Sequence, residues 1–195
     1  MKKDIILSGV GGQGILSIAT VIGWAALSED LHLKQAEVHG MSQRGGDVQS
    51  NLRLSTGPIF SDLIPKGECD LILSLEPMEA LRYLPWLSKD GWIVTNSTPF
   101  VNIPNYPPLE EVMAELHSVP NVITLDCDSV ARAAMAPRGA NMVLLGAAAG
   151  VLGILGPDDL RKGIANVFAR KGEAVVASNI AAFDAGLEES KNVMK

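Results

Sequence analysis

The residues best suited to do chemistry lie near the start of the chain. An apolar segment at residues 4–8 leads into Gly9-Val-Gly-Gly-Gln-Gly14, and a second apolar stretch follows from Ile15. A strand, a glycine-rich turn and a helix in this order form a βα unit that can hold phosphate. The unpaired N–H groups at the helix start would favour an anion. Three interpretations stay open: a structural turn, an anion or nucleotide site, and a surface for docking another subunit.

Each position of this turn has an expected role. Gly9 would permit the tight turn, Gly11 would allow the backbone to approach a partner closely, and Gly14 would let the helix pack on the strand. The Gln13 amide could donate to an anion or cap the helix. The candidate anion-binding or docking residues of the turn are therefore Gly9, Gly11, Gly12, Gln13 and Gly14.

A second polar, glycine-rich segment covers residues 39–46. The Arg44 guanidinium could pair bidentately with a carboxylate or phosphate, or form an ion pair on a surface loop. His39 could donate a proton or bind a metal, or could be a hydrogen-bonded loop residue. The candidate residues of this segment are His39, Ser42, Gln43, Arg44, Gly45 and Gly46.

Other polar residues follow later strands. Asn96, Ser97 and Thr98 could line the same crevice or cap their loop. Glu37 lies near the offset of roughly 20 residues at which dinucleotide enzymes keep a ribose-binding acid. It favours the alternative of a self-contained NAD-binding oxidoreductase. The sequence contains no catalytic triad order, HExxH motif or close carboxylate pair, so we expect no catalytic residue in this chain alone and no metal site.

Alternating strand and helix patterns must position these residues. Strands are predicted at residues 4–8, 33–38, 48–55, 70–75, 91–95 and 122–125, and helices at 13–28, 76–84, 126–134, 141–155, 157–170 and 173–189. They predict an α/β, Rossmann-like fold, with a mostly parallel sheet and helices on both faces. Residues 39–47 are too short for a parallel crossover, so the third strand should run antiparallel and this loop should border the glycine turn. The proline-rich stretch at 99–108 is predicted to be a surface loop.

Composition narrows the classes of function. The net charge of −6 argues against nucleic-acid binding, and the longest apolar stretch, at 142–155, falls short of a membrane span. The two cysteines, Cys69 and Cys127, are predicted to be buried thiols. We expect one domain over residues 1–195 and a cytoplasmic location.

The glycine turn and the SQRGG loop together resemble a known family. With the segments 71–76 and 96–99 and the glycine- and alanine-rich late helix, they are similar to the gamma-type subunits of the 2-oxoacid:ferredoxin oxidoreductases, most of all the indolepyruvate type. The resemblance implies a complex that oxidatively decarboxylates aryl pyruvates, forms an aryl-acetyl-CoA and reduces ferredoxin. It also implies a large alpha subunit that carries thiamine diphosphate, Mg and 4Fe-4S clusters, with CoA as co-substrate.

This division of labour agrees with the residues present. A cubane cluster takes four thiolates, whereas this chain has two cysteines. A thiamine diphosphate fold usually carries Gly-Asp-Gly followed by asparagine, whereas Gly46-Asp47 is followed by Val48. We therefore expect no cofactor bound by this chain itself. It would dock on the thiamine-bearing subunit and help to close its active site, and an uncovered docking face could form homodimers. A non-catalytic nucleotide-binding scaffold is the remaining alternative.

Overall fold

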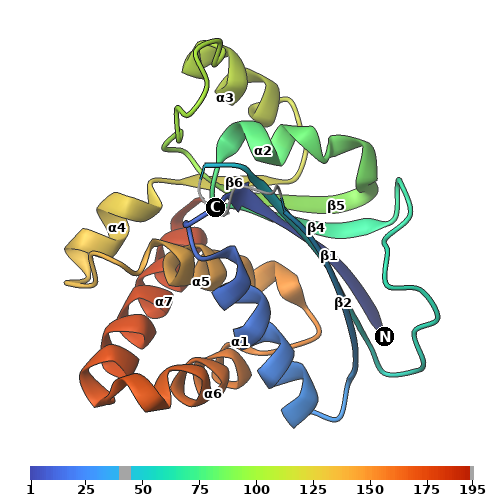
Figure 1. Cartoon of the computed structure of the whole chain (residues 1–195), viewed down its shortest axis with the longest axis vertical. Helices are drawn as coiled ribbons and strands as arrows, with labels where there is room; N and C mark the ends of the chain where they lie inside the picture. The colour runs from blue at the N-terminus through green and yellow to red at the C-terminus, as the bar shows by residue number, and fades with distance from the viewer. Residues whose placement is uncertain (40–44, 194–195) are drawn as a thin grey trace.

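A six-stranded sheet forms the centre of the protein (Figure 1). The structure, a computed structural model, describes residues 1–39 and 45–193. Within these residues the strand order is β2-β3-β1-β4-β5-β6. The strands are β1 (Lys2–Val10), β2 (His32–His39), β3 (Asp47–Ser55), β4 (Cys69–Ser74), β5 (Leu87–Asn96) and β6 (Val122–Leu125).

The third strand is antiparallel, as predicted. β3 lies between β1 and β2 and runs antiparallel to both, whereas the β1–β4, β4–β5 and β5–β6 pairs are parallel. The sequence did not predict that β3 would be inserted between the first two strands. This insertion moves β2 to the edge of the sheet, one strand further from the glycine turn.

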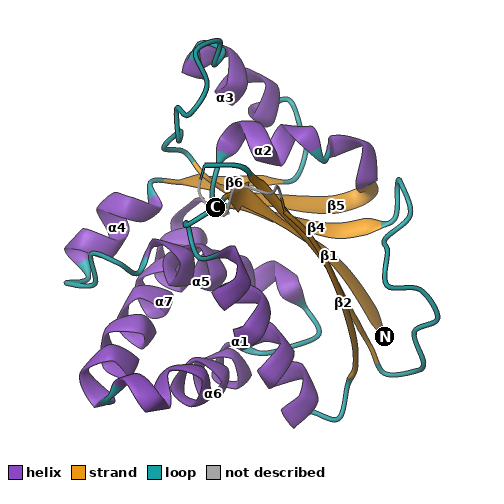
Figure 2. Cartoon of the chain, in the orientation of Figure 1, coloured by secondary structure: helices purple, strands orange, loops and turns teal. Residues whose placement is uncertain are grey.

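Helices cover both faces of the sheet (Figure 2). α2 and α3 lie on one face, and α1, α5, α6 and α7 lie on the other. The helices are α1 (Ile15–Ser28), α2 (Pro77–Arg82), α3 (Leu109–His117), α4 (Cys127–Ala133), α5 (Ala140–Leu152), α6 (Pro157–Phe168) and α7 (Glu173–Val193), with 3-10 turns η1 (Leu84–Trp86) and η2 (Ala169–Lys171). α3 was not predicted. Among the described residues, none of these helices is both long and apolar enough to cross a membrane.

The strand pattern explains the two-sided core. In β1, Ile5 and Leu7 pack into the larger hydrophobic cluster with α1 and α5, while Ile6 packs into the smaller cluster with α2 and α3. In β4, Leu71 and Ile72 divide between the clusters in the same way. Alternate side chains of a strand point to opposite faces, so an unbroken apolar strand requires a cover on both sides.

The predicted burial of the late glycine- and alanine-rich helix is confirmed, and its glycines explain the packing. A Cβ added at Gly146 of α5 would lie 1.9 Å from the carbonyl oxygen of Phe183 in α7. A Cβ added at Gly186 of α7 would lie 1.9 Å from the carbonyl oxygen of Val143 in α5. The two helix backbones therefore touch at a point where only glycine fits. Gly153, with φ of 74°, ends α5 in a left-handed conformation.

A buried ion pair fixes the amino-terminal part of the sheet. Asp4 of β1 is fully buried and pairs with Arg53, its direct neighbour on β3, at 2.8 Å (Oδ1–Nε) and 2.9 Å (Oδ2–Nη2). The Arg53 Nη1 also donates to the carbonyl oxygens of Ser61 and Leu63. One side chain thus satisfies a buried carboxylate and anchors the loop between β3 and β4.

Candidate functional site

The glycine turn lies where the helices that follow two neighbouring strands lie on opposite faces of the sheet. β1 continues into α1 on one face, whereas the neighbouring β4 continues into α2 on the other face. In α/β proteins, ligands commonly bind between the carboxyl ends of two such strands. We use the name carboxyl-end region for the residues at and around these strand ends, which are 9–14, 45–46, 75–76 and 97–108.

The Gln13 side chain bridges the ends of β1 and β4. Its Oε1 accepts a hydrogen bond from the Val10 N–H at 2.7 Å, and its Nε2 donates to the Leu75 carbonyl oxygen at 3.1 Å. Val10 ends β1, and Leu75 follows the last residue of β4. The amide therefore joins the two strand ends with both of its polar atoms, and it does not cap α1.

Gly11 allows a close backbone approach, and the approaching backbone belongs to this chain. The Gly11 N–H donates to the Gly46 carbonyl oxygen at 2.8 Å, and the Gly45 N–H donates to the Gly11 carbonyl oxygen at 3.4 Å. This pairing confirms that Gly45 and Gly46, at the end of the loop before β3, border the glycine turn. Gly12 remains exposed, with φ of 104° and no heavy atom within 4 Å of an added Cβ.

Two further glycines of the turn accommodate side chains. A Cβ at Gly9 would lie 2.8 Å from Gln13 Oε1, and one at Gly14 would lie 2.6 Å from Asn141 Nδ2. Gly14 is also in a left-handed conformation, with φ of 90°, at the start of α1. Asn141 donates to the Gly14 carbonyl oxygen at 3.3 Å. Gly14 therefore admits a polar contact from α5.

The loop at 97–108 is held over the end of β4 by a buried carboxylate. Glu76 is 1% exposed and begins α2, where its Oε2 accepts from the Glu79 N–H at 2.8 Å. Its Oε1 accepts from the Tyr106 hydroxyl at 2.5 Å and from the Phe100 N–H at 3.4 Å. Burial, together with the neighbouring Glu76 carboxylate, raises the pKa of Tyr106 well above its ordinary value. The phenol therefore keeps its proton and acts as the donor.

The same loop reaches back to the glycine turn. The Asn102 amide donates to the Gly45 carbonyl oxygen, so the loop contacts the segment that pairs with Gly11. The sequence singled out neither Asn102 nor Tyr106. Both belong to a proline-rich loop whose contacts are long-range, and no local pattern marks such contacts.

Asn96, Ser97 and Thr98 lie at the same carboxyl end of the strands, but they face α4. The Asn96 Oδ1 accepts from the N–H groups of Cys127 at 3.0 Å and Thr98 at 3.3 Å. The Ser97 N–H donates to the carbonyl oxygen of Leu125 at the end of β6. These are capping contacts. They are separated from the glycine turn on β1 because β4 lies between β1 and β5.

The start of α4 adds a capping carboxylate to this group. Asp126 accepts from the Ser129 N–H at 2.9 Å and the Ser129 hydroxyl at 2.6 Å, and the Thr98 hydroxyl also donates to it. The Ser129 hydroxyl and N–H lower the pKa of Asp126 from its ordinary value. Asp126 therefore stabilises the helix start in its ionised form.

Part of the predicted site falls outside the described residues. Ser42, Gln43 and Arg44 are in this group, together with positions 40 and 41. The His39 backbone ends β2 opposite Val48 of β3. Gly45 and Gly46 are therefore the members of the predicted loop whose contacts with the glycine turn can be described.

The position of Glu37 does not support the NAD-binding alternative. Glu37 lies on the edge strand β2, and β3 separates it from β1 and the glycine turn. Two strand spacings of about 4.8 Å separate β2 from β1. The Glu37 carboxylate is exposed and accepts a hydrogen bond from Gln35. A ribose acid belongs on the strand beside the one that carries the glycine turn.

Exposed apolar side chains lie near the carboxyl ends of the strands and at the start of α1. Leu16 follows it on α1 and is 44% exposed, and Val38 near the end of β2 is 57% exposed. Phe100 and Val101 of the 97–108 loop are 44% and 66% exposed. We call Leu16, Val38, Phe100 and Val101 the apolar rim. Water-exposed apolar groups beside polar atoms that are already bonded within the chain are typical of a protein interface.

The two thiols do not fit an iron–sulfur cluster. Cys69 belongs to the smaller hydrophobic cluster and Cys127 to the larger one, on opposite faces of the sheet. Burial raises the pKa of Cys69 to about 12 and that of Cys127 well above its ordinary value. Metals bind thiolates, so two separated, protonated thiols are unsuited to hold iron. The prediction that both thiols are buried is confirmed.

The comparisons with known proteins agree with this architecture. Residues 4–189 match the family described as pyruvate ferredoxin/flavodoxin oxidoreductase, and the chain belongs to this family. It is 39% identical over 160 residues to indolepyruvate oxidoreductase subunit IorB from Methanothermobacter thermautotrophicus. The matched region covers 78% of this chain and 81% of that protein. It is 35% identical over 204 residues to the subunit of the same name from Pyrococcus horikoshii, covering 100% of this chain and 99% of that protein.

A solved structure shares the fold. The 2-oxoglutarate:ferredoxin oxidoreductase from Magnetococcus marinus, with 2-oxoglutarate, coenzyme A and succinyl-CoA bound, superposes with a TM-score of 0.75 at 21% identity. The match covers 98% of this chain but 31% of that chain, so this protein spans about a third of the larger polypeptide. The α/β fold predicted from the sequence is therefore confirmed.

Proposed function

We propose that this chain is the small subunit of an indolepyruvate-type 2-oxoacid:ferredoxin oxidoreductase. The observation that carries the proposal is the similarity to indolepyruvate oxidoreductase subunits along the whole chain. In the complex, thiamine diphosphate, Mg and 4Fe-4S clusters belong to a large partner subunit, and electrons pass to ferredoxin. The thiamine diphosphate supplies the decarboxylation chemistry there, and this chain supplies a surface.

The carboxyl-end region is the proposed docking surface. The apolar rim offers area to bury, and exposed Gly12 leaves room for a partner's backbone. The polar atoms of Gln13 and Glu76 are already bonded within the chain, so docking would not strip them of water at a cost. Docking here would help to exclude water from the partner's active site.

Coenzyme A enters this proposal as a co-substrate. The Magnetococcus relative binds coenzyme A, and the loop at 39–46 carries the arginine expected to meet an anion. We propose that Arg44 contacts either a coenzyme A phosphate or a carboxylate of the partner, with His39, Ser42 and Gln43 beside it. A guanidinium suits both anions through paired hydrogen bonds.

A pair of exposed apolar residues provides the test of docking. Val101 belongs to the apolar rim, whereas Phe60 is 93% exposed in the loop between β3 and β4, at the opposite end of the strands. Val101→Asp should weaken assembly with the large subunit by at least about tenfold, a difference of about 1.4 kcal/mol. Phe60→Asp, which adds the same charge, should leave assembly unchanged. Affinity is measured by titrating labelled small subunit into the large subunit.

The role of Arg44 is tested separately in the assembled complex. Arg44→Ala should weaken assembly or raise the coenzyme A concentration needed for turnover. Unchanged assembly together with unchanged turnover would discard the role of Arg44. Equal losses from Val101→Asp and Phe60→Asp would instead reject the carboxyl-end region as the docking surface.

A further inference from the structure

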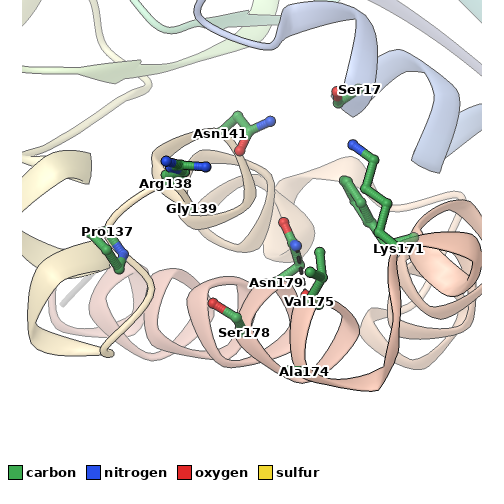
Figure 3. Close-up of a pocket in the computed structure, with 11 residues that line it drawn as sticks. Ser17, Pro137, Arg138, Gly139, Asn141, Lys171, Ala174, Val175, Ser178 and Asn179 are labelled. Atoms are coloured by element: carbon green, nitrogen blue, oxygen red, sulfur yellow. Dashed lines mark hydrogen bonds between the residues drawn. The ribbon is translucent and has the colours of Figure 1, made fainter.

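A cavity of about 520 Å³ lies among α1, α5, α6 and α7, on the face of the sheet that these helices cover (Figure 3). Its wall combines Ser17 of α1, residues 137–139 and Asn141 at the start of α5, Phe168 of α6, and residues of η2 and α7. These segments are far apart in the sequence, so the fold alone creates the cavity. Cavities of roughly 300–1,000 Å³ accommodate small organic ligands.

Two cationic side chains belong to this wall. Figure 3 shows Arg138 on one side of the cavity and Lys171 on the other, and the Lys171 amine lies 5.2 Å from the centre of the Phe168 ring. Neither forms an ion pair with any residue that the structure describes. The described wall contains no carboxylate, although the chain carries a net charge of −6. A concave surface with one sign of charge concentrates the opposite charge.

The remaining wall residues specify the chemistry further. Ser17 and Ser178 contribute hydroxyl groups, and Asn141 and Asn179 contribute amides whose Nδ2 atoms already donate to backbone carbonyls. Phe168 and Val175 supply an apolar part. Donors that come from several directions suit a phosphate, whose oxygens point outward in three dimensions, better than a planar carboxylate. The apolar part suits an organic substituent.

We propose that this cavity binds a small organic phosphate, with Arg138 and Lys171 holding the phosphate and Phe168 and Val175 contacting the organic part. The proposal does not depend on docking, because none of these residues belongs to the carboxyl-end region. The sequence offered only a weak signal. Arg138 and Lys171 each precede a glycine at a helix start, a position that usually indicates a solvated helix end.

Binding of adenosine monophosphate to the full chain, without a partner subunit, provides the test. Isothermal titration should show saturable binding at least about tenfold tighter than that of inorganic phosphate, whereas adenosine should not bind. Arg138→Gln and Lys171→Gln should each weaken binding by about tenfold, which corresponds to about 1.4 kcal/mol. Arg170→Gln is the matched control, because it removes the same charge from a neighbouring exposed residue outside the wall.

Four results would overturn the proposal. Absence of binding at millimolar concentration would reject the site, and equal affinity for inorganic phosphate would reject the organic part. An equal loss in Arg170→Gln would mean that general charge attraction accounts for binding. Binding of a glutamate-rich peptide but not of adenosine monophosphate would assign the cavity to a protein partner. Since the large subunit is absent from all these measurements, they leave the proposed docking function untouched.

Discussion

In the glycine turn, a Cβ added at Gly9 or Gly14 would lie nearest to side-chain atoms of Gln13 or Asn141, respectively. At the α5–α7 contact they belong to the backbones of Phe183 and Val143. A side chain can rotate away from an added methyl group, whereas two packed helices must move apart as whole bodies. The same residue type therefore permits an adjustable contact in one region and a fixed one in the other. The glycine turn can therefore adjust to a small added group, whereas the α5–α7 contact cannot.

The largest expected effect comes from Gly146→Ala. The added methyl group would meet a backbone carbonyl, so we expect a loss of about 3 kcal/mol in the free energy of unfolding, at the upper end of overpacking costs. Urea denaturation followed by circular dichroism measures it. Gly150→Ala is the control, because Gly150 is exposed on the same helix. Higher helix propensity should make that variant neutral or more stable by up to about 1 kcal/mol. Equal effects in the two variants would contradict the backbone contact.

Gly14→Ala should have a smaller effect that a second substitution relieves. Positive φ costs an alanine about 1–2 kcal/mol, and the methyl group must also displace the Asn141 amide. In the Asn141→Ala background the displacement disappears, so the same change should cost less. A double-mutant cycle measures this coupling. A coupling energy of zero would show that the Asn141 side chain does not limit the space at Gly14.

Asp126→Ala tests the capping contacts at the start of α4. Loss of the cap should reduce the free energy of unfolding by about 1 kcal/mol at neutral pH. Because the folded protein lowers the pKa of Asp126, its stabilisation is complete above the ordinary value of about 3.9 and is lost as pH falls through the lower folded value. Wild type and variant should therefore converge in stability below about pH 4. A difference that stays constant between pH 7 and pH 2 would rule out the ionised cap.

The smallest effect concerns the two thiols. Because burial raises the pKa of Cys69 to about 12 and that of Cys127 well above its ordinary value, neither should form thiolate near pH 8. A disulfide reagent should label no thiol of the folded protein within minutes, and both thiols after unfolding in guanidinium. Rapid labelling of one thiol in the folded state would show that its part of the core opens easily.

Much of the fold followed from local patterns. Unbroken apolar strands such as 70–75 predicted a sheet covered on both faces, and the short connection at 39–47 predicted an antiparallel strand. Both predictions are confirmed. α3 was missed because it is a helix of nine residues after a proline-rich loop, with a narrow apolar face formed by Val112 and Leu116. The insertion of β3 between β1 and β2 has no local signal, because strand order depends on pairing between distant segments.

The candidate site, like the fold, could be predicted from the sequence only in part. The glycine positions and the nearness of Gly45 and Gly46 to the turn could be predicted, since each depends on local geometry or on loop length. The bond from Tyr106 to Glu76 and the cavity near Arg138 could not be predicted. Each needs segments that are remote in sequence to arrive at one place. The predicted roles of Asn96, Ser97 and Thr98 in ligand binding or docking stay predictions.

The sequence by itself determined the strand and helix types, the glycine turn and the family, because these depend on residue patterns and motifs within short segments. Only the tertiary structure decided that Gln13 bridges two strand ends, that Glu37 lies far from the turn, and that α5 and α7 touch through Gly146 and Gly186. The physical reason is that chain order fixes local conformation, whereas close packing of distant segments fixes which atoms meet.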